Sequence, residues 1–176
     1  MKKLLLVIDY QRDFVDGALG FPGAEKLDGP IAQKIAAYRS AGDDVAFTLD
    51  THGEDYPDTQ EGRKLPVAHC LREAPGWELY GQTAKARREG DAVVEKPAFP
   101  SLELGNWLRE KGYDRVELVG LVSYICVISN AIVAKAALPE AEIIVDAACT
   151  AGPDPALHEK ALDVMEQGLQ ITVTNR

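Results

Sequence analysis

Residues 4–9 read Leu4-Leu5-Leu6-Val7-Ile8-Asp9, five apolar residues closed by a carboxylate. A run this short cannot cross a bilayer, which takes roughly 20 residues, and it is typical of a strand buried on both faces. Apolar residues at helical spacing follow it (Ile31, Ile35 and Tyr38), and then a second short run at residues 45–49. This order predicts two parallel strands joined by a helical crossover.

The same alternation continues to the end of the chain. Further strands are expected at residues 92–94, 116–119, 143–145 and 171–173, with helices between them. Gly112 is expected to end the helix that contains Leu102, Trp107 and Leu108, because glycine readily adopts the left-handed conformation found after helices. We therefore predict an α/β fold: a six-stranded, mostly parallel sheet between two layers of helices.

Composition narrows the class of protein. The 176 residues suit one domain, expected to span 1–176, and 46% hydrophobic with 27% charged residues argues against disorder. A net charge of -9 disfavours nucleic acid, and no apolar run is long enough to predict a membrane partner. Three cysteines without a secretory signal favour the reducing cytoplasm. A homo-oligomer is also expected, because exposed helices of such folds commonly associate.

Reactive side chains follow four of the expected strands. Asp9 follows the first, Asp50 and His52 the second, Lys96 the third and Cys126 the fourth. Each alone would be interpreted as a cap, a solvated lysine or a core cysteine. Because ligands bind at the carboxyl ends of parallel strands, their coincidence at one edge predicts an active site there. The long segment from residue 51 to 89 is a candidate active-site insertion.

Three motifs resemble those of the isochorismatase-like hydrolase superfamily, in its cysteine hydrolase branch with the nicotinamidases. They are Asp9–Phe14, Glu95–Phe99 and Gly120–Val127. The resemblance spans the chain and implies a strand order of 3-2-1-4-5-6 and a catalytic triad of Asp9, Lys96 and Cys126. It also implies a cis peptide at Leu121-Val122, with the amides of Val122 and Cys126 forming an oxyanion hole.

The chemistry of the three residues agrees with this triad. Cys126 falls at the start of a helical run, where the helix dipole and a nearby Lys96 ammonium would favour a thiolate nucleophile. Asp9 can accept the thiol proton and later donate it to a leaving amine. The expected resting state is thus a thiolate beside protonated Asp9.

Asp50, His52 and His69 are the candidate metal ligands. Asp50 and His52 are two residues apart, so both side chains project to one side of an extended segment, and His69 supplies a third ligand. One carboxylate and two imidazoles suit a divalent ion, zinc first, with manganese or iron as alternatives, and nicotinamidases resemble this arrangement. The alternative is that both histidines are surface residues of an acidic loop.

The expected substrate is a small amide, cleaved at its C–N bond through a thioester. Phe14 is expected to wall the substrate site. The Trp-Pro-x-His stretch of nicotinamidases, whose tryptophan stacks on the pyridine ring, is replaced by Leu65-Pro66-Val67-Ala68-His69. The alternatives are an isochorismatase-type enol ether hydrolase that uses Asp9 and Lys96 without Cys126, and a binding protein that keeps only the fold. A dinucleotide-binding domain is excluded because no G-x-G-x-x-G follows the first strand.

Other conspicuous residues have simpler interpretations. Cys70 and Cys149 are expected to be buried small hydrophobic residues, and His158 a structural residue near the start of the last helix. Trp77 lies in the insertion and is expected to pack there or to wall the pocket.

Overall fold

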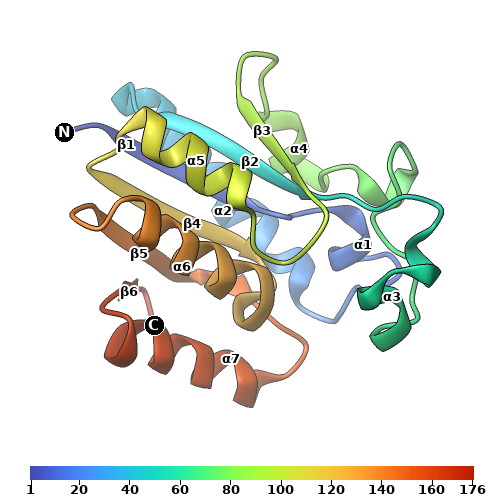
Figure 1. The fold of residues 1–176 in the computed structure, drawn as a ribbon. Coiled ribbons are helices and arrows are strands. Elements are labelled where there is room, and N and C mark those ends of the chain that lie inside the picture. The colour runs from blue at the N-terminus through green and yellow to red at the C-terminus, as the bar shows by residue number, and fades with distance from the viewer.

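The computed structural model describes residues 1–176 and contains one sheet of six parallel strands in the order β3-β2-β1-β4-β5-β6 (Figure 1). The predicted fold class and strand order are confirmed. The strands are β1 (Lys3–Ile8), β2 (Asp44–Asp50), β3 (Ala92–Lys96), β4 (Arg115–Leu121), β5 (Glu142–Ala151) and β6 (Thr172–Thr174). The helices are α1 (Arg12–Val15), α2 (Asp28–Ala41), α3 (Gln60–Lys64), α4 (Gly81–Ala86), α5 (Leu102–Lys111), α6 (Ile128–Ala137) and α7 (Pro155–Asp163).

Helices cover both faces of the sheet, with α5, α6 and α7 on one face and α2 on the other (Figure 1). The position of β1 at the centre of the sheet explains why its residues 4–8 are all apolar. Leu4, Leu6 and Ile8 belong to the core under α5–α7, whereas Leu5 and Val7 belong to the core under α2. Successive side chains of a strand point to opposite faces, so a strand between two helical layers needs apolar residues at every position.

The helix boundaries follow local chemistry. Ser101 begins α5, where its hydroxyl accepts a hydrogen bond from the amide of Leu104. As predicted, Gly112 follows the last residue of α5, with a φ of 64°. Asp154 begins α7 by accepting from the amides of Ala156 and Leu157. These residues fix where α5 begins and ends and where α7 begins.

The insertion after β2 is tied to α1 and α2 by two carboxylates that are at least half-buried. Asp28 of α2 accepts hydrogen bonds from the amides of Gln82 and Thr83 and so caps α4. Asp13 of α1 accepts from the amide of Cys70 at 2.7 Å. The insertion therefore forms a fixed wall beside the carboxyl ends of β1 and β2.

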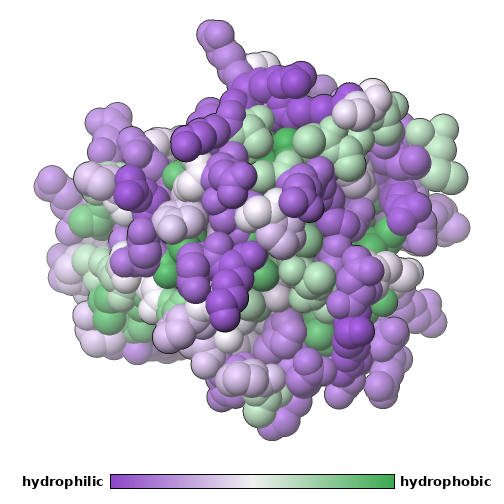
Figure 2. Space-filling model, turned by 180° about the vertical axis from the view of Figure 1, so that it is seen from behind, coloured by the Kyte–Doolittle hydropathy of each residue, from purple (hydrophilic) through white to green (hydrophobic).

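The surface is charged and mixed. Figure 2, from behind the sheet as drawn in Figure 1, shows mainly hydrophilic side chains with small, separated groups of hydrophobic ones. None of the helices combines the length and apolar sequence that crossing a bilayer requires.

Candidate active site

Asp9, Lys96 and Cys126 meet at the carboxyl edge of the sheet. Nζ of Lys96 lies 2.5 Å from Oδ2 of Asp9 and 3.5 Å from Sγ of Cys126. Asp9 and Lys96 are fully buried, and Cys126 is 3% exposed. The structure therefore brings the three expected residues together, with the lysine between the carboxylate and the thiol.

The strand ends place Asp9 and Lys96. Asp9 follows β1 with a φ of 42°, and its Oδ1 accepts a 2.6 Å hydrogen bond from the hydroxyl of Thr48 on β2. Lys96 is the last residue of β3, and its Nζ also donates to the carbonyl of Ala98 at 3.2 Å. Because β2 lies between β1 and β3, the lysine side chain reaches over the end of β2 to meet Asp9.

Cys126 lies in a wide helical turn, Ser123–Val127, between β4 and α6. Gly120 allows β4 to approach β1 closely before that turn, since a Cβ at this position would lie 2.0 Å from the carbonyl oxygen of Ile8. The peptide Leu121-Val122 is cis, as the family resemblance implies. Asn130 of α6 donates to the carbonyl of Cys126 at 2.8 Å and fixes the other end of the turn.

Burial dominates the electrostatics of the three residues. It raises the pKa of Asp9, an effect that the Lys96 ammonium opposes. It also raises the pKa of Cys126 well above its ordinary value; Lys96 lowers this pKa, while the carboxylates of Asp9 and Asp50 raise it. Burial lowers the pKa of Lys96, but Asp9 and Cys126 outweigh that and keep it a cation.

The pKa of Cys126 is shifted in the direction opposite to the one that the expected thiolate resting state requires. Desolvation and the neighbouring carboxylates outweigh the attraction of one ammonium group, which raises the pKa of Cys126 and favours its thiol form. The sulfur becomes nucleophilic only when its proton moves to an acceptor, and Asp9 is the nearer of the two carboxylates that contact the same lysine.

The three expected metal ligands also converge. Nε2 of His52 lies 3.0 Å from Oδ2 of Asp50, and Nε2 of His69 lies 3.3 Å from the same oxygen. Burial raises the pKa of Asp50, but the hydrogen bonds to the two histidines and the charge of Lys96 lower it by a larger amount. The net shift is downward, so Asp50 is ionised. All three residues are buried, and their ligand atoms lie within 4.8 Å of one another.

This donor set fits a divalent cation. Nδ1 of His69 lies 2.7 Å from the carbonyl oxygen of Val67, and a proton on Nδ1 would leave Nε2 free as a ligand. Two imidazoles and a carboxylate that face one point suit zinc, manganese or iron. The alternative of surface histidines on an acidic loop is wrong, because His52 is 7% and His69 2% exposed.

Glu61 is a residue of this cluster that the sequence analysis missed. Its Oε1 lies 3.7 Å from Nε2 of both His52 and His69. Glu61 belongs to α3 in the insertion, among several other acidic residues. The position of Glu61 on α3 directs its side chain toward the two histidines. No sequence pattern distinguishes Glu61 from its acidic neighbours.

A cavity of about 170 Å³ opens between the thiol and the histidine cluster. Apolar side chains form most of its wall, and the residues that line it are Phe14, Leu19, Asp50, Leu65, His69, Phe99, Val122, Ile125, Cys126 and Pro153. Phe14 thus lies where expected. Trp77 does not line the cavity; its indole donates to the hydroxyl of Thr51 at 2.8 Å, which holds the loop after β2.

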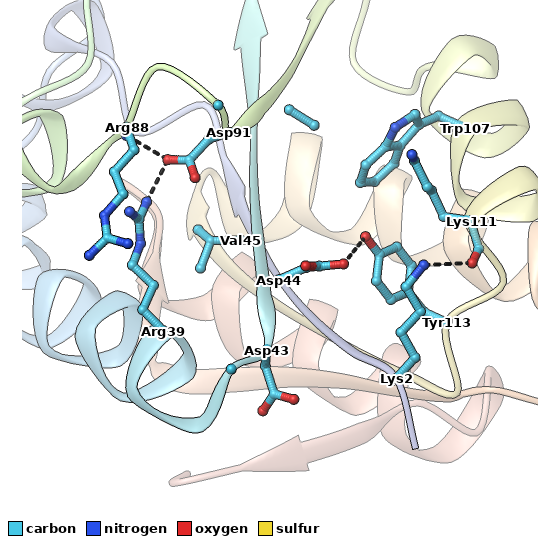
Figure 3. Close-up of a pocket in the computed structure, with 13 residues that line it drawn as sticks. Lys2, Arg39, Asp43, Asp44, Val45, Arg88, Asp91, Trp107, Lys111 and Tyr113 are labelled. Carbon is cyan, nitrogen blue, oxygen red and sulfur yellow. Dashed lines mark hydrogen bonds and ion pairs between the residues drawn. The ribbon is translucent and has the colours of Figure 1, made fainter.

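A larger hollow of about 440 Å³ lies at the opposite edge of the sheet, near the amino ends of β1 and β2 (Figure 3). Several of its polar side chains have partners within the hollow. Arg39 contacts Asp91, the Asp44 carboxylate accepts from the Tyr113 hydroxyl, and the Lys2 ammonium donates to the Lys111 carbonyl (Figure 3). This hollow contains neither a cysteine nor a histidine, so the smaller cavity is the candidate active site.

Comparison with known families agrees with the geometry. Residues 3–176 match the model of the isochorismatase domain. The chain belongs to the isochorismatase family. A relative from Bacillus subtilis (strain 168), the uncharacterized isochorismatase family protein PncA, is 33% identical over 144 residues, which cover 75% of this chain and 78% of the relative.

Two solved structures of similar family members are amidases. Pyrazinamidase of Pyrococcus horikoshii in complex with zinc is 26% identical, with a TM-score of 0.86 over 100% of both chains. N-carbamoylsarcosine amidase from Thermoplasma acidophilum is 32% identical, with a TM-score of 0.83 over 98% of this chain and 95% of that one. The predicted enzyme class, a hydrolase of C–N bonds other than peptide bonds, agrees with both structures.

Proposed function

We propose that this protein is a cysteine-dependent amidase that hydrolyses the C–N bond of a small, uncharged amide, in the manner of nicotinamidases. The observation that carries the proposal is the chain of contacts from Asp9 through Lys96 to the Cys126 sulfur at the wall of an apolar cavity. A carboxylate, an ammonium group and a thiol in this order can make a nucleophile and supply the proton that a leaving amine needs.

The first half of the reaction forms a thioester. The thiol proton of Cys126 moves to Asp9 as the sulfur bonds to the amide carbon, and the carbonyl oxygen becomes an oxyanion. The amides of Val122 and Cys126 donate hydrogen bonds to it, and Lys96 compensates the negative charge near the sulfur. Collapse of the intermediate breaks the C–N bond as Asp9 returns its proton to the nitrogen, and ammonia leaves.

The second half uses water. Asp9, again a carboxylate, accepts a proton from a water molecule as that water attacks the thioester carbon, and the acid product leaves with the sulfur reprotonated. Burial of Asp9 suits this double role, since the raised pKa of the carboxyl group lets it hold the proton between the two steps.

A divalent ion would be held by Asp50, His52 and His69, with the Glu61 carboxylate beside them. Such an ion supplies Lewis acidity and orients bound oxygen or nitrogen atoms. Zinc is the first candidate, since the structure from Pyrococcus horikoshii is described as a zinc complex.

The side chains of the cavity wall limit which acyl groups of a substrate can bind. Leu65 stands on its wall in place of a stacking tryptophan, with Phe14 and Phe99 as the aromatic residues. No cationic side chain lines the cavity, and Lys96 is fully buried with Asp9. Away from the ion that Asp50, His52 and His69 would hold, a carboxylate on the substrate would lose its hydration without gaining a partner, which disfavours acidic amides.

Ammonia release from a panel of amides tests this function. The panel should hold nicotinamide, benzamide, isobutyramide and an N-carbamoyl amino acid, each with and without a chelator. We expect hydrolysis of uncharged amides by the wild type and none by Cys126→Ala. Full activity of Cys126→Ala on an enol ether such as isochorismate, with no activity of the wild type on amides, would support the ether hydrolase alternative instead.

A further inference from the structure

His158 of the last helix contacts the turn that carries the nucleophile. Nδ1 of His158 on α7 lies 2.9 Å from the hydroxyl oxygen of Ser123. Ser123 is the first residue of the turn Ser123–Val127 and precedes Cys126 by three residues. His158 itself does not line the cavity. We propose that His158 is a positioning residue, which holds Ser123 and thereby the turn that presents the Cys126 sulfur to the substrate.

The environment of Ser123 gives this contact its importance. The Ser123 side chain is fully buried, and His158 is the one side chain that hydrogen-bonds to its hydroxyl. A buried hydroxyl without a partner is unfavourable, so loss of the imidazole would drive Ser123 to turn toward another partner or toward water. Either movement shifts the first residue of a turn whose fourth residue is the nucleophile.

Other contacts limit where this movement can go. Asn130 donates to the carbonyl of Cys126 and to that of Phe99, so the C-terminal end of the turn is fixed to the loop after β3. The hydroxyl of Tyr124 accepts a hydrogen bond from the amide of Asp154 at 3.3 Å. The turn is therefore held between α6 and the start of α7, and the His158 contact fixes its N-terminal end.

The imidazole is suited to a permanent hydrogen bond. Burial lowers the pKa of His158 and Arg176 lowers it further, against the opposing effect of Glu159. A neutral ring keeps one nitrogen as donor and one as acceptor, and the Ser123 hydroxyl can complement either. An asparagine side chain places a polar atom near the position of Nδ1, whereas a glutamine side chain places one near the position of Nε2. Comparing the two substitutions therefore shows whether the polar atom at the Nδ1 position is required or only a side chain of similar length.

The proposal rests on Cys126 as the nucleophile of the proposed amidase, and its test has a readout that needs no substrate. The readouts are kcat and KM with a hydrolysed amide, the rate of Cys126 alkylation by iodoacetamide, and the midpoint of thermal unfolding. We expect His158→Ala to lower kcat and the alkylation rate by about tenfold or more, with KM nearly unchanged, because misplacement of a reacting group by about an ångström has effects of this size or larger. His158→Asn should restore both rates and His158→Gln should not. Lys160→Ala, an exposed change on the same helix, is the control.

A double-mutant cycle with Ser123→Ala decides whether the hydrogen bond is the cause. Without the hydroxyl, no buried group is left unpaired when the imidazole is removed, so His158→Ala should have no further effect on either rate in the Ser123→Ala background. The proposal is overturned if His158→Ala leaves the alkylation rate unchanged in the wild-type background, or if its effect is the same in both backgrounds. If the wild type hydrolysed no amide, the alkylation comparison would still decide this proposal, independently of the proposed function.

Discussion

Lys96 joins the two halves of the candidate site, because its Nζ lies 3.5 Å from Oδ1 of Asp50 as well as 2.5 Å from Oδ2 of Asp9. Asp50 and Lys96 are paired in register at the ends of β2 and β3. The buried Lys96 ammonium thus lies between the carboxylate of Asp9, beside the nucleophile, and the carboxylate of Asp50, in the candidate metal site. A change at Lys96 should therefore alter the charge balance of both halves.

Removing Lys96 or Asp9 should slow the reaction while moving the ionisation of Cys126 in opposite directions. We expect Lys96→Ala and Asp9→Asn each to lower kcat/KM by at least about a hundredfold, the size expected for an acid–base or electrostatic partner. Lys96 lowers the pKa of Cys126 and Asp9 raises it. Alkylation of Cys126 measured against pH should therefore shift to higher pH in Lys96→Ala and to lower pH in Asp9→Asn. Unchanged rates and profiles in Lys96→Ala would mean that the triad is wrong for this protein.

Cys126 should be the one cysteine that a small alkylating reagent reaches. Cys126 lines the cavity, whereas Cys70 and Cys149 are buried away from it. Mass spectrometry after iodoacetamide treatment of the native protein should find Cys126 modified first. Cys126→Ser should abolish amide hydrolysis without loss of the folded state, because a hydroxyl ionises poorly. Cys149→Ser is the matched control and should keep its activity; preferential labelling of Cys149 would contradict this prediction.

The histidine cluster should bind a divalent ion. Elemental analysis of protein purified without chelator should find close to one equivalent of zinc, manganese or iron, and His52→Ala should lose it. Glu61→Gln should weaken binding by about tenfold or more, since groups beside a metal site commonly contribute this much. Glu54→Gln changes an exposed acid of the same insertion and should have no effect. Background metal content in the wild type would show that the cluster is held by its own hydrogen bonds.

A second ion cluster, in which the half-buried Lys34 of α2 pairs with two buried carboxylates of the sheet, should control stability. Nζ of Lys34 lies 2.5 Å from Glu117 and 2.6 Å from Asp146. Lys34→Met would leave two carboxylates without their cation, and we expect it to lower the free energy of unfolding by about 3 to 5 kcal/mol. Urea unfolding at about pH 7 measures this difference. Lys3→Met, which removes a more exposed pair with Asp43, should cost less than about 1 kcal/mol.

The pH dependence of the Lys34 effect follows from Asp146. Burial raises the pKa of Asp146, but the hydrogen bond from Lys34 outweighs this and holds it below the ordinary value of 3.8. The stabilisation is thus present above that value and is lost as pH falls through the lowered pKa. The difference between Lys34→Met and wild type should shrink below about pH 4, where carboxylates begin to protonate. A difference that grew on acidification would contradict this assignment.

Much of the fold was predictable from local pattern. Apolar runs such as residues 4–8 and 45–49, separated by helical spacing, indicate parallel strands whatever the rest of the chain does. The triad was predictable because Asp9, Lys96 and Cys126 each lie at or just after the end of a strand, and parallel strands bring such ends to one edge.

The sequence by itself thus determined the α/β alternation, the edge that carries the chemistry, and the residue types gathered there, because these depend on periodicity and on position relative to strand ends. Only the tertiary structure decided that Glu61 faces the histidines, that His158 contacts Ser123, and that the pKa of Cys126 is raised rather than lowered. The first two are distances between segments far apart in the chain. The third is a balance between desolvation and neighbouring charges, and burial and separation exist only once the chain is folded.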